Sequence, residues 1–118
     1  MKIAVTSHNL STITGHAGRC RKFWIYEVNG RQIVNKALLE LPLAQTFRAC
    51  APGATHPLDE VNVLITGGMK MGLFYRLKQK GVLAVSTTET DPDRAVASWL
   101  DGGLETVPPQ VQEMPEDS

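Results

Sequence analysis

The sequence predicts an α/β fold, with a five-stranded mixed sheet and helices on its faces. Two observations lead to this prediction. The first half contains three strand-like segments, and the second half alternates apolar strand-like runs with helical ones. A length of 118 residues, with 42% apolar and 20% charged residues, fits one ordinary globular domain. We therefore expect the element order βββ-α-β-α-β-α in a single domain over residues 1–106.

Three strands are expected in the first half of the chain. Ile3–Thr6 alternates weakly and is followed by polar residues, which predicts a short strand and then a loop. Phe23–Val28 is rich in aromatic and β-branched residues, which suit a half-buried pleated surface. Because Asn29-Gly30 favours a type I′ turn, Arg31–Leu39 is expected to return antiparallel to Phe23–Val28.

Two further strands are expected in the second half. Val61–Thr66 is a nearly continuous apolar run, which is typical of a strand covered on both faces, and Val82–Val85 has the same character. Between the hairpin and the first of these strands, Ala44–Ala51 is expected to form a short helix that Pro52-Gly53 ends.

Two longer helices follow from periodicity and capping residues. Met69–Lys80 has apolar residues at helical spacing and is followed by Gly81, a typical helix stop. Asp91 is a good N-cap before Pro92, and this second helix is expected to end at Gly102-Gly103. From residue 107 onward the composition predicts a disordered acidic tail, residues 107–118.

The net charge of zero conceals an uneven distribution. Residues 1–88 hold eleven Lys and Arg against four acidic residues, and residues 89–118 hold one basic residue against eight acidic ones. A neutral total argues against a polyanion binder, so nucleic acid is not the expected partner. The basic body points instead to a small anionic ligand.

The sequence also indicates the cellular compartment of the protein. No stretch approaches the roughly 18 apolar residues that a membrane span needs, and the chain starts directly in a strand-like run without signal-peptide features. The two cysteines, Cys20 and Cys50, are too few for a disulfide framework. We therefore expect a cytoplasmic protein with two thiols and no membrane association, with one disulfide between them as the alternative.

Several short motifs, taken in order, resemble the nitrogenase iron–molybdenum cofactor biosynthesis accessory family. This family includes the NifX and NafY type proteins and the C-terminal domain of NifB. The motifs span roughly residues 1–104 and are Met1–Val5, Gly15–Arg19 leading into Phe23–Tyr26, Val63–Met69, Lys80–Val82 and Arg94–Val96. The resemblance implies a ribonuclease-H-like fold and the binding of iron–sulfur precursors of the cofactor.

This chain departs from the family pattern in three places. Ala17 replaces an aromatic residue in the family's His-Phe-Gly loop, and Lys70 stands where a further glycine is frequent. A His-rich stretch that some members carry is reduced to Cys50 and His56. The ligand of this chain therefore has to be inferred from its own residues.

A ribonuclease-H-like fold also raises the hypothesis of a metal-dependent nuclease. Two-metal hydrolysis needs several carboxylates that converge on one site. The expected strands Ile3–Thr6 and Val61–Thr66 contain no acidic residue, and Asp59 and Glu60 precede the second strand. Walker A, GxGxxG and His-Glu-x-x-His motifs are also missing from the sequence. We therefore expect that the protein is not an enzyme.

The candidate ligand site follows from the predicted topology. Ligands of α/β sheets gather beyond the carboxyl ends of the strands, where the loops after Ile3–Thr6 and Val61–Thr66 should meet. Given the family resemblance, His16 is the preferred ligand. Arg19 and the amides of Gly67 and Gly68 are expected to stabilise an anion, with Met69 beside them.

Other candidates have plain structural alternatives. Cys20, Cys50 and His56 complete the set of candidate metal ligands, although Cys20 suits a small buried apolar position and the other two suit structural or exposed ones. Met69 can equally pack in the core. Two cysteines cannot house a four-cysteinyl cluster in one chain, so transient carriage, or sharing across a homodimer, is expected.

Three functions remain open at the level of sequence. The first is a carrier for an iron–sulfur or iron–molybdenum cofactor precursor, which passes the cluster between metallocluster donor and acceptor proteins. The second is a metal-free interaction or regulatory module of the same fold. The third, a nucleotide or nucleic-acid binder, rests on the basic segment Arg19–Lys22 alone.

Overall fold

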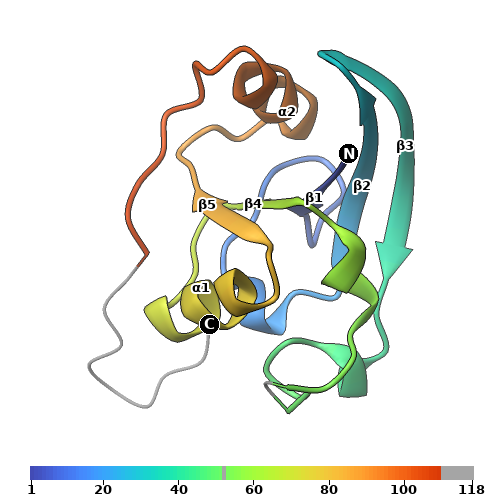
Figure 1. Cartoon of the computed structure of the whole chain (residues 1–118), viewed down its shortest axis with the longest axis vertical. Helices are drawn as coiled ribbons and strands as arrows, with labels where there is room; N and C mark the ends of the chain where they lie inside the picture. The colour runs from blue at the N-terminus through green and yellow to red at the C-terminus, as the bar shows by residue number, and fades with distance from the viewer. Residues whose placement is uncertain (52, 110–118) are drawn as a thin grey trace.

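Five strands form one mixed sheet in the computed structural model, which describes residues 1–51 and 53–109 (Figure 1). The strands are β1 (Lys2–Thr6), β2 (Lys22–Asn29), β3 (Gln32–Glu40), β4 (Val63–Thr66) and β5 (Leu83–Ser86). They lie in the order β3-β2-β1-β4-β5. β1, β4 and β5 are parallel to one another, and β2 is antiparallel to both of its neighbours, β1 and β3. The predicted α/β fold with a five-stranded mixed sheet is confirmed.

The β2–β3 hairpin forms where Asn29-Gly30 predicted it, but its turn lies one residue later. Asn29 pairs with Gln32, so Gly30 and Arg31 are the two central residues of the turn. Gly30 has a φ of 64°, and Arg31 does not have a positive φ. This is the pattern of a type II′ turn, which needs glycine at its first central position, rather than of the expected type I′ turn.

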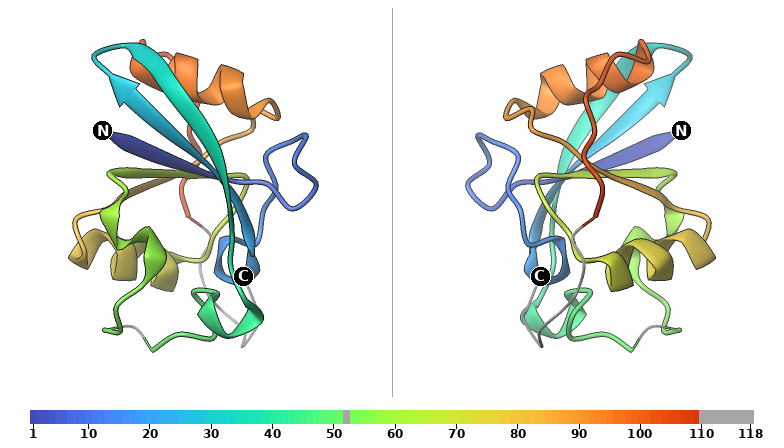
Figure 2. Two further views of the ribbon diagram at one scale, coloured as in Figure 1. Left: turned by 90° about the vertical axis from the view of Figure 1, so that its right-hand side faces the viewer. Right: turned by 90° about the vertical axis from the view of Figure 1, so that its left-hand side faces the viewer.

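Two α-helices cover opposite faces of the sheet, α1 (Met71–Gln79) and α2 (Pro92–Leu100) (Figure 2). Successive side chains along each strand point to opposite faces of the sheet, as expected for a pleated sheet. The core on the α1 face includes Ala4, Phe23, Leu64, Leu77 and Ala84. The core on the α2 face includes Ile3, Val5, Tyr26, Ile65, Ala95 and Val96. β4 is buried along its whole length, as its apolar run predicted.

The ends of both helices follow local sequence rules. The Asp91 carboxylate accepts hydrogen bonds from the amides of Asp93 and Arg94 at the start of α2, as its position before Pro92 predicted. α1 begins at Met71, two residues later than expected, because Lys70 has an extended backbone. Gly81 has a φ of 80° directly after the turn that ends α1.

The predicted helix over Ala44–Ala51 is wrong. A single 3-10 turn, η2 (Leu43–Gln45), is followed by an extended residue, Thr46, whose hydroxyl accepts a hydrogen bond from the amide of Ala49. The amide of Arg48 donates outward to the carbonyl of Gly18 at 2.8 Å rather than back along a helix. This tertiary contact outweighs the weak helical preference of so short a segment.

The chain end differs in part from the prediction. Val107 pairs with Ser86 of β5, so the ordered structure extends past residue 106. Residues 110–118 of the predicted acidic tail lie outside the described residues. Within the described part of the chain, neither helix has the length and apolar character required to traverse a bilayer.

Candidate functional site

A row of hydroxyl side chains crosses the sheet at the carboxyl ends of its three parallel strands. Thr6 ends β1, Thr66 ends β4 and Ser86 ends β5, and Thr66 is in register with Ser86. The hydroxyl oxygens of Thr6 and Thr66 lie 2.9 Å apart, within hydrogen-bond distance. All three residues are at most 2% exposed. Ser86 Oγ is the one buried side-chain nitrogen or oxygen in the described residues that has no hydrogen-bond partner.

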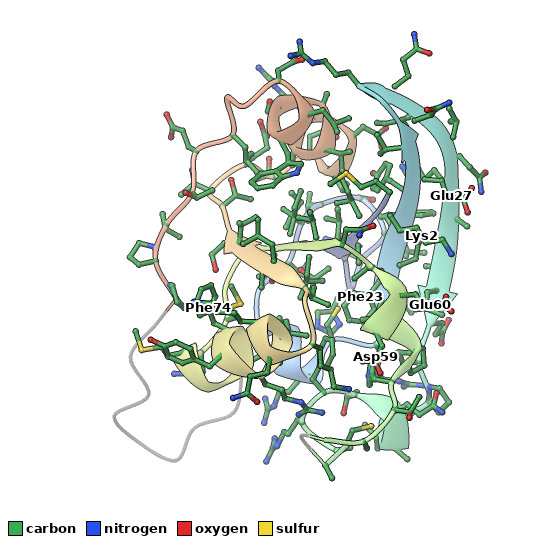
Figure 3. The ribbon with its side chains drawn as sticks, in the orientation of Figure 1. Lys2, Phe23, Glu27, Asp59, Glu60 and Phe74 are labelled. Atoms are coloured by element: carbon green, nitrogen blue, oxygen red, sulfur yellow. The ribbon has the colours of Figure 1, made fainter. Side chains whose placement is uncertain are left out.

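This edge of the sheet therefore carries hydroxyl groups rather than carboxylates. Asp59 and Glu60 lie in η3 (Pro57–Glu60), near the start of β1, where Lys2 approaches Glu60 at 3.9 Å (Figure 3). These two acidic residues are thus at the opposite end of the strands, as the sequence predicted. The row at the carboxyl ends is buried, and it contains no pair of carboxylates for two-metal chemistry.

The loop after β1 and the loop after β4 meet at this edge, as predicted. The carbonyl of Thr14 accepts three hydrogen bonds, from the Thr6 hydroxyl at 2.6 Å, the Gly67 amide at 3.0 Å and the Thr66 hydroxyl at 3.2 Å. A Cβ at Gly67 would lie 3.2 Å from this carbonyl group, which explains why a glycine stands there.

A second contact fixes the same loop further along. η1 (Ala17–Arg19) is a single 3-10 turn, and its Ala17 amide donates to the carbonyl of Gly68 at 3.2 Å. Ala17 and Gly18 are buried, whereas Arg19 is exposed. The two loops therefore form one hydrogen-bonded unit beside the start of α1.

His16 lies at the surface of this unit in a strained conformation. Its φ of 54° and ψ of 53° place it in the left-handed region, directly before η1. The residue is exposed, and its carbonyl accepts a hydrogen bond from the amide of Arg19 at 3.0 Å. Among the described residues, its imidazole has no hydrogen bond or ion pair. Both ring nitrogens of His16 can therefore reach a ligand.

The positive end of α1 faces the same edge. Lys70 is the N-cap of α1 and gives no side-chain hydrogen bond to the helix amides. The first amides of a helix carry partial positive charge and favour anions. Met69, which was predicted beside the ligand, is 1% exposed and packs in the core of the α1 face.

The remaining candidate ligands do not join His16. Cys20 is fully buried, burial raises the pKa of its thiol, and its Sγ donates to the carbonyl of Lys22 at 3.1 Å. Cys50 is half-buried, with its Sγ 3.6 Å from the carbonyl of Ala44. Both cysteines are free, so the alternative of a disulfide between them is wrong.

His56 is committed to the fold through both of its ring nitrogens. Nε2 lies 2.6 Å from the carbonyl of Gln45, and Nδ1 accepts a hydrogen bond from the amide of Leu58 at 3.0 Å. The ring is 3% exposed and stacks on Phe47 with centroids 4.3 Å apart. Burial lowers the pKa of His56, which favours the neutral ring.

The expected set of four metal ligands is therefore not assembled in the fold. Within residues 1–51 and 53–109, no group of three or more His, Cys, Asp or Glu side chains is placed to hold a metal ion. The amides of Gly67 and Gly68, which were predicted to stabilise an anion, are already bonded to the Thr14 carbonyl and the Thr66 hydroxyl. The arrangement therefore offers the exposed imidazole of His16 and the first amides of α1. Such a set suits reversible contact with a preformed anionic group better than permanent coordination.

Sequence reasoning missed the hydroxyl row. Thr6, Thr66 and Ser86 occupy the last position of each parallel strand, and that shared position is the pattern that indicates a common edge.

A family model described as dinitrogenase iron-molybdenum cofactor matches residues 1–102. The chain belongs to the dinitrogenase iron–molybdenum cofactor family. A relative, the uncharacterized protein MJ0580 of Methanocaldococcus jannaschii, is 27% identical over 107 residues, which cover 89% of this chain and 90% of the relative.

Solved structures similar to this family member share its fold. One is a proposed dinitrogenase of Methanocaldococcus jannaschii, with a TM-score of 0.70, 13% identity, and coverage of 93% of this chain and 97% of that one. Another is a proposed NifB protein from Thermotoga, with a TM-score of 0.66, 21% identity, and coverage of 96% and 98%. At these identities the likeness establishes the fold alone.

Proposed function

We propose that this member of the dinitrogenase iron–molybdenum cofactor family is a non-catalytic carrier of the NifX and NafY type. Its cargo is an anionic iron–sulfur or iron–molybdenum cofactor precursor, which contacts His16 at the edge formed by Gly67 and Gly68. The observation that carries the proposal is the exposure of the His16 imidazole on a loop that hydrogen bonds hold in place.

The chemistry of this edge suits such a cargo. Imidazole is a good ligand for iron, and thiolate-ligated clusters are usually anionic. The uncapped amides at the start of α1 and the basic body of residues 1–88 favour an anion.

The small number of protein ligands explains why the role is carriage. With His16 as the one proposed protein ligand, the cluster keeps its own ligands or shares those of a donor, an acceptor or a second copy of the chain. Weak attachment allows release to the acceptor protein. The two free cysteines fit a reducing compartment, and we place the carrier in the cytoplasm.

An anaerobic titration with a synthetic thiolate-ligated 4Fe–4S cluster tests the proposal. Optical spectra should show saturable uptake by the native chain. His16→Gly removes the imidazole without adding backbone strain, and it should weaken uptake by about tenfold or more, since loss of even an outer-shell partner costs 10–100-fold in metal sites.

The matched control is His8→Gly, which removes another exposed histidine from the same loop. It should take up the cluster like the native chain. Equal uptake by His16→Gly and the native chain would remove His16 from the role. Absence of uptake by the native chain would favour a metal-free interaction module.

A further inference from the structure

The strand β3 forms one edge of the sheet and is its longest strand (Figure 1). Among the described residues it has a strand beside it on one side alone, where it pairs with β2. Eight of its nine residues are exposed. Its large apolar side chains Ile33, Val34 and Leu38 are 39%, 59% and 44% exposed. An edge of this kind, with free main-chain groups and apolar side chains, is a template for one more strand.

The features that usually protect an edge strand are weak in β3. The strand contains no proline, and its single lysine is Lys36. The Lys36 ammonium group lies 2.9 Å from Oδ1 of Asp93 and 4.4 Å from the centre of the Trp24 ring. It is therefore directed over β2 and towards α2 rather than outward from the edge. The positive charge that would repel an incoming strand is balanced within the chain itself.

A bulge in the hairpin gathers the apolar side chains of β3 on one face of the sheet. The pairing between β2 and β3 skips Val34. In a regular strand, Ile33 and Leu38 would point to opposite faces, because they are five positions apart. With the bulge, Ile33 pairs with Val28 and Leu38 pairs with Trp24. Both partners pack in the core of the α2 face, so Ile33 and Leu38 also lie on that face.

The exposed edge of β3 is complementary to itself when a second copy runs antiparallel to it. A two-fold axis at Lys36, with the bulge kept as β2 reads it, places Ile33 of each copy beside Leu38 of the other. The same register places Arg31 of each copy beside Glu40 of the other. Arg31 and Glu40 are exposed, and neither has an ion pair among the described residues. Opposite charges at the two ends of one strand match a second copy in the antiparallel direction.

We propose that β3 is a dimerisation edge, at which a second copy of this chain pairs antiparallel and joins the two five-stranded sheets into one. Main-chain hydrogen bonds hold the two strands together, and the apolar and charged pairs fix their register. Because the two-fold axis reverses the strands, the edges that carry His16 lie at opposite ends of the joined sheet. The dimer therefore does not combine two cluster sites, and it is independent of the proposed carrier function.

Sedimentation equilibrium of the full chain tests the proposal. The edge of one strand is a small interface, and small interfaces dissociate on dilution, so we expect a Kd of about 10 μM. The mass should rise from that of one chain, 12.9 kDa, in dilute solution towards twice this value at about 100 μM. A mass that stays at one chain up to about 500 μM, or that grows beyond two chains, would overturn the proposal.

Lysine substitutions at the two edges of the sheet locate the interface. Val34→Lys should weaken dimerisation by about tenfold or more, because it adds a charge to each copy at an apolar edge. The matched control is Leu83→Lys, which changes an apolar residue that is 47% exposed on β5, the opposite edge strand. It should dimerise like the native chain, and circular dichroism checks that both variants fold. Equal weakening by the two variants, or weakening by Leu83→Lys alone, shows that the assignment to β3 is wrong.

Charge reversal tests the antiparallel register. Arg31→Glu and Glu40→Arg should each weaken dimerisation by about fivefold to tenfold, because two attractive contacts become repulsive. An equimolar mixture of the two variants should associate like the native chain, since opposite charges face each other again at both ends. If the mixture associates as weakly as each variant alone, the antiparallel register is wrong. His16→Gly should dimerise like the native chain, so loss of cluster uptake and loss of dimerisation are separate results.

Discussion

The hydroxyl of Tyr26 donates a 2.6 Å hydrogen bond to Oδ1 of Asp93 and so joins β2 to α2. Lys36 of β3 approaches the same oxygen at 2.9 Å, and its ammonium group lies 4.4 Å from the centre of the Trp24 ring. The hydrogen bond from Tyr26 and then that from Lys36 hold the pKa of Asp93 below its ordinary value. One carboxylate thus links α2 to two neighbouring strands.

Tyr26→Phe should lower the free energy of unfolding by about 1–2 kcal/mol, because it removes a hydrogen bond to a charged group without changing the packed ring. Chemical unfolding in urea measures this loss. Tyr75→Phe is the matched control, since Tyr75 is 52% exposed and its hydroxyl has no hydrogen bond among the described residues. Similar losses in the two variants would show that the bond to Asp93 does not stabilise the fold.

The buried His56 predicts a decrease of stability in mild acid. Burial, helped by the charges of Arg76 and Lys80, lowers the pKa of His56 against the opposing effects of Gln45 and Asp59. The folded state therefore favours the neutral ring. Its contribution to stability is fully present above pH 6.5, the ordinary value, and is lost as pH falls below it.

Urea unfolding at pH 7.5, 6.5 and 5.5 should show this decrease. His56→Gln should be less stable at pH 7.5, by about 1–3 kcal/mol, because the Leu58 amide loses its acceptor. It should also show a weaker dependence on pH across this range, because it cannot titrate. His8→Gln should keep the native dependence, and an unchanged dependence in His56→Gln would assign the effect to other groups.

The contact between Gly67 and Thr14 predicts different outcomes for two adjacent glycines. A Cβ at Gly67 would lie 3.2 Å from the Thr14 carbonyl group, which is backbone and has little room to move. A Cβ at Gly68 would have its nearest neighbour, the Cα of Gly15, at 3.9 Å. Neither glycine has a positive φ.

Gly67→Ala should therefore lower the free energy of unfolding by about 1–3 kcal/mol, the usual cost of an overpacked position. Gly68→Ala should change it much less, and the pair can be compared by thermal unfolding. If both variants unfold at the same temperature, the close approach of the two loops does not limit the residue at position 67.

The parts of the fold that sequence predicted correctly are governed by local interactions. Asp91 and Pro92 start α2 through contacts within four residues. The burial of β4 could be predicted because Val61–Thr66 is an almost continuous apolar run. The segment Ala44–Ala51 was mispredicted because its conformation depends on distant partners. Arg48 bonds to Gly18, and Phe47 stacks on His56.

The candidate site could be predicted from sequence only where it depends on strand order. The general rule for α/β sheets correctly brought the loops of His16 and Gly67 together, since it depends on strand order alone. The commitment of His56 to Gln45 and Leu58, and the burial of Cys20, could not be read from sequence. Those contacts join segments that meet only in the folded chain.

The left-handed conformation of His16 predicts a stability gain when this residue is replaced by glycine. The left-handed region costs a residue that has a Cβ about 1–2 kcal/mol of conformational free energy, and glycine has no such cost. Glycine, however, loses more backbone entropy on folding. His16→Gly should therefore stabilise the protein by about 0.5–1 kcal/mol, whereas His16→Ala should not. His8→Gly should destabilise it, because His8 has no positive φ to relieve.

Urea unfolding of the three variants measures the differences. A gain in His16→Gly together with weaker cluster uptake would mean that the native chain keeps a strained histidine for binding, and a loss of stability in His16→Gly would contradict the strain.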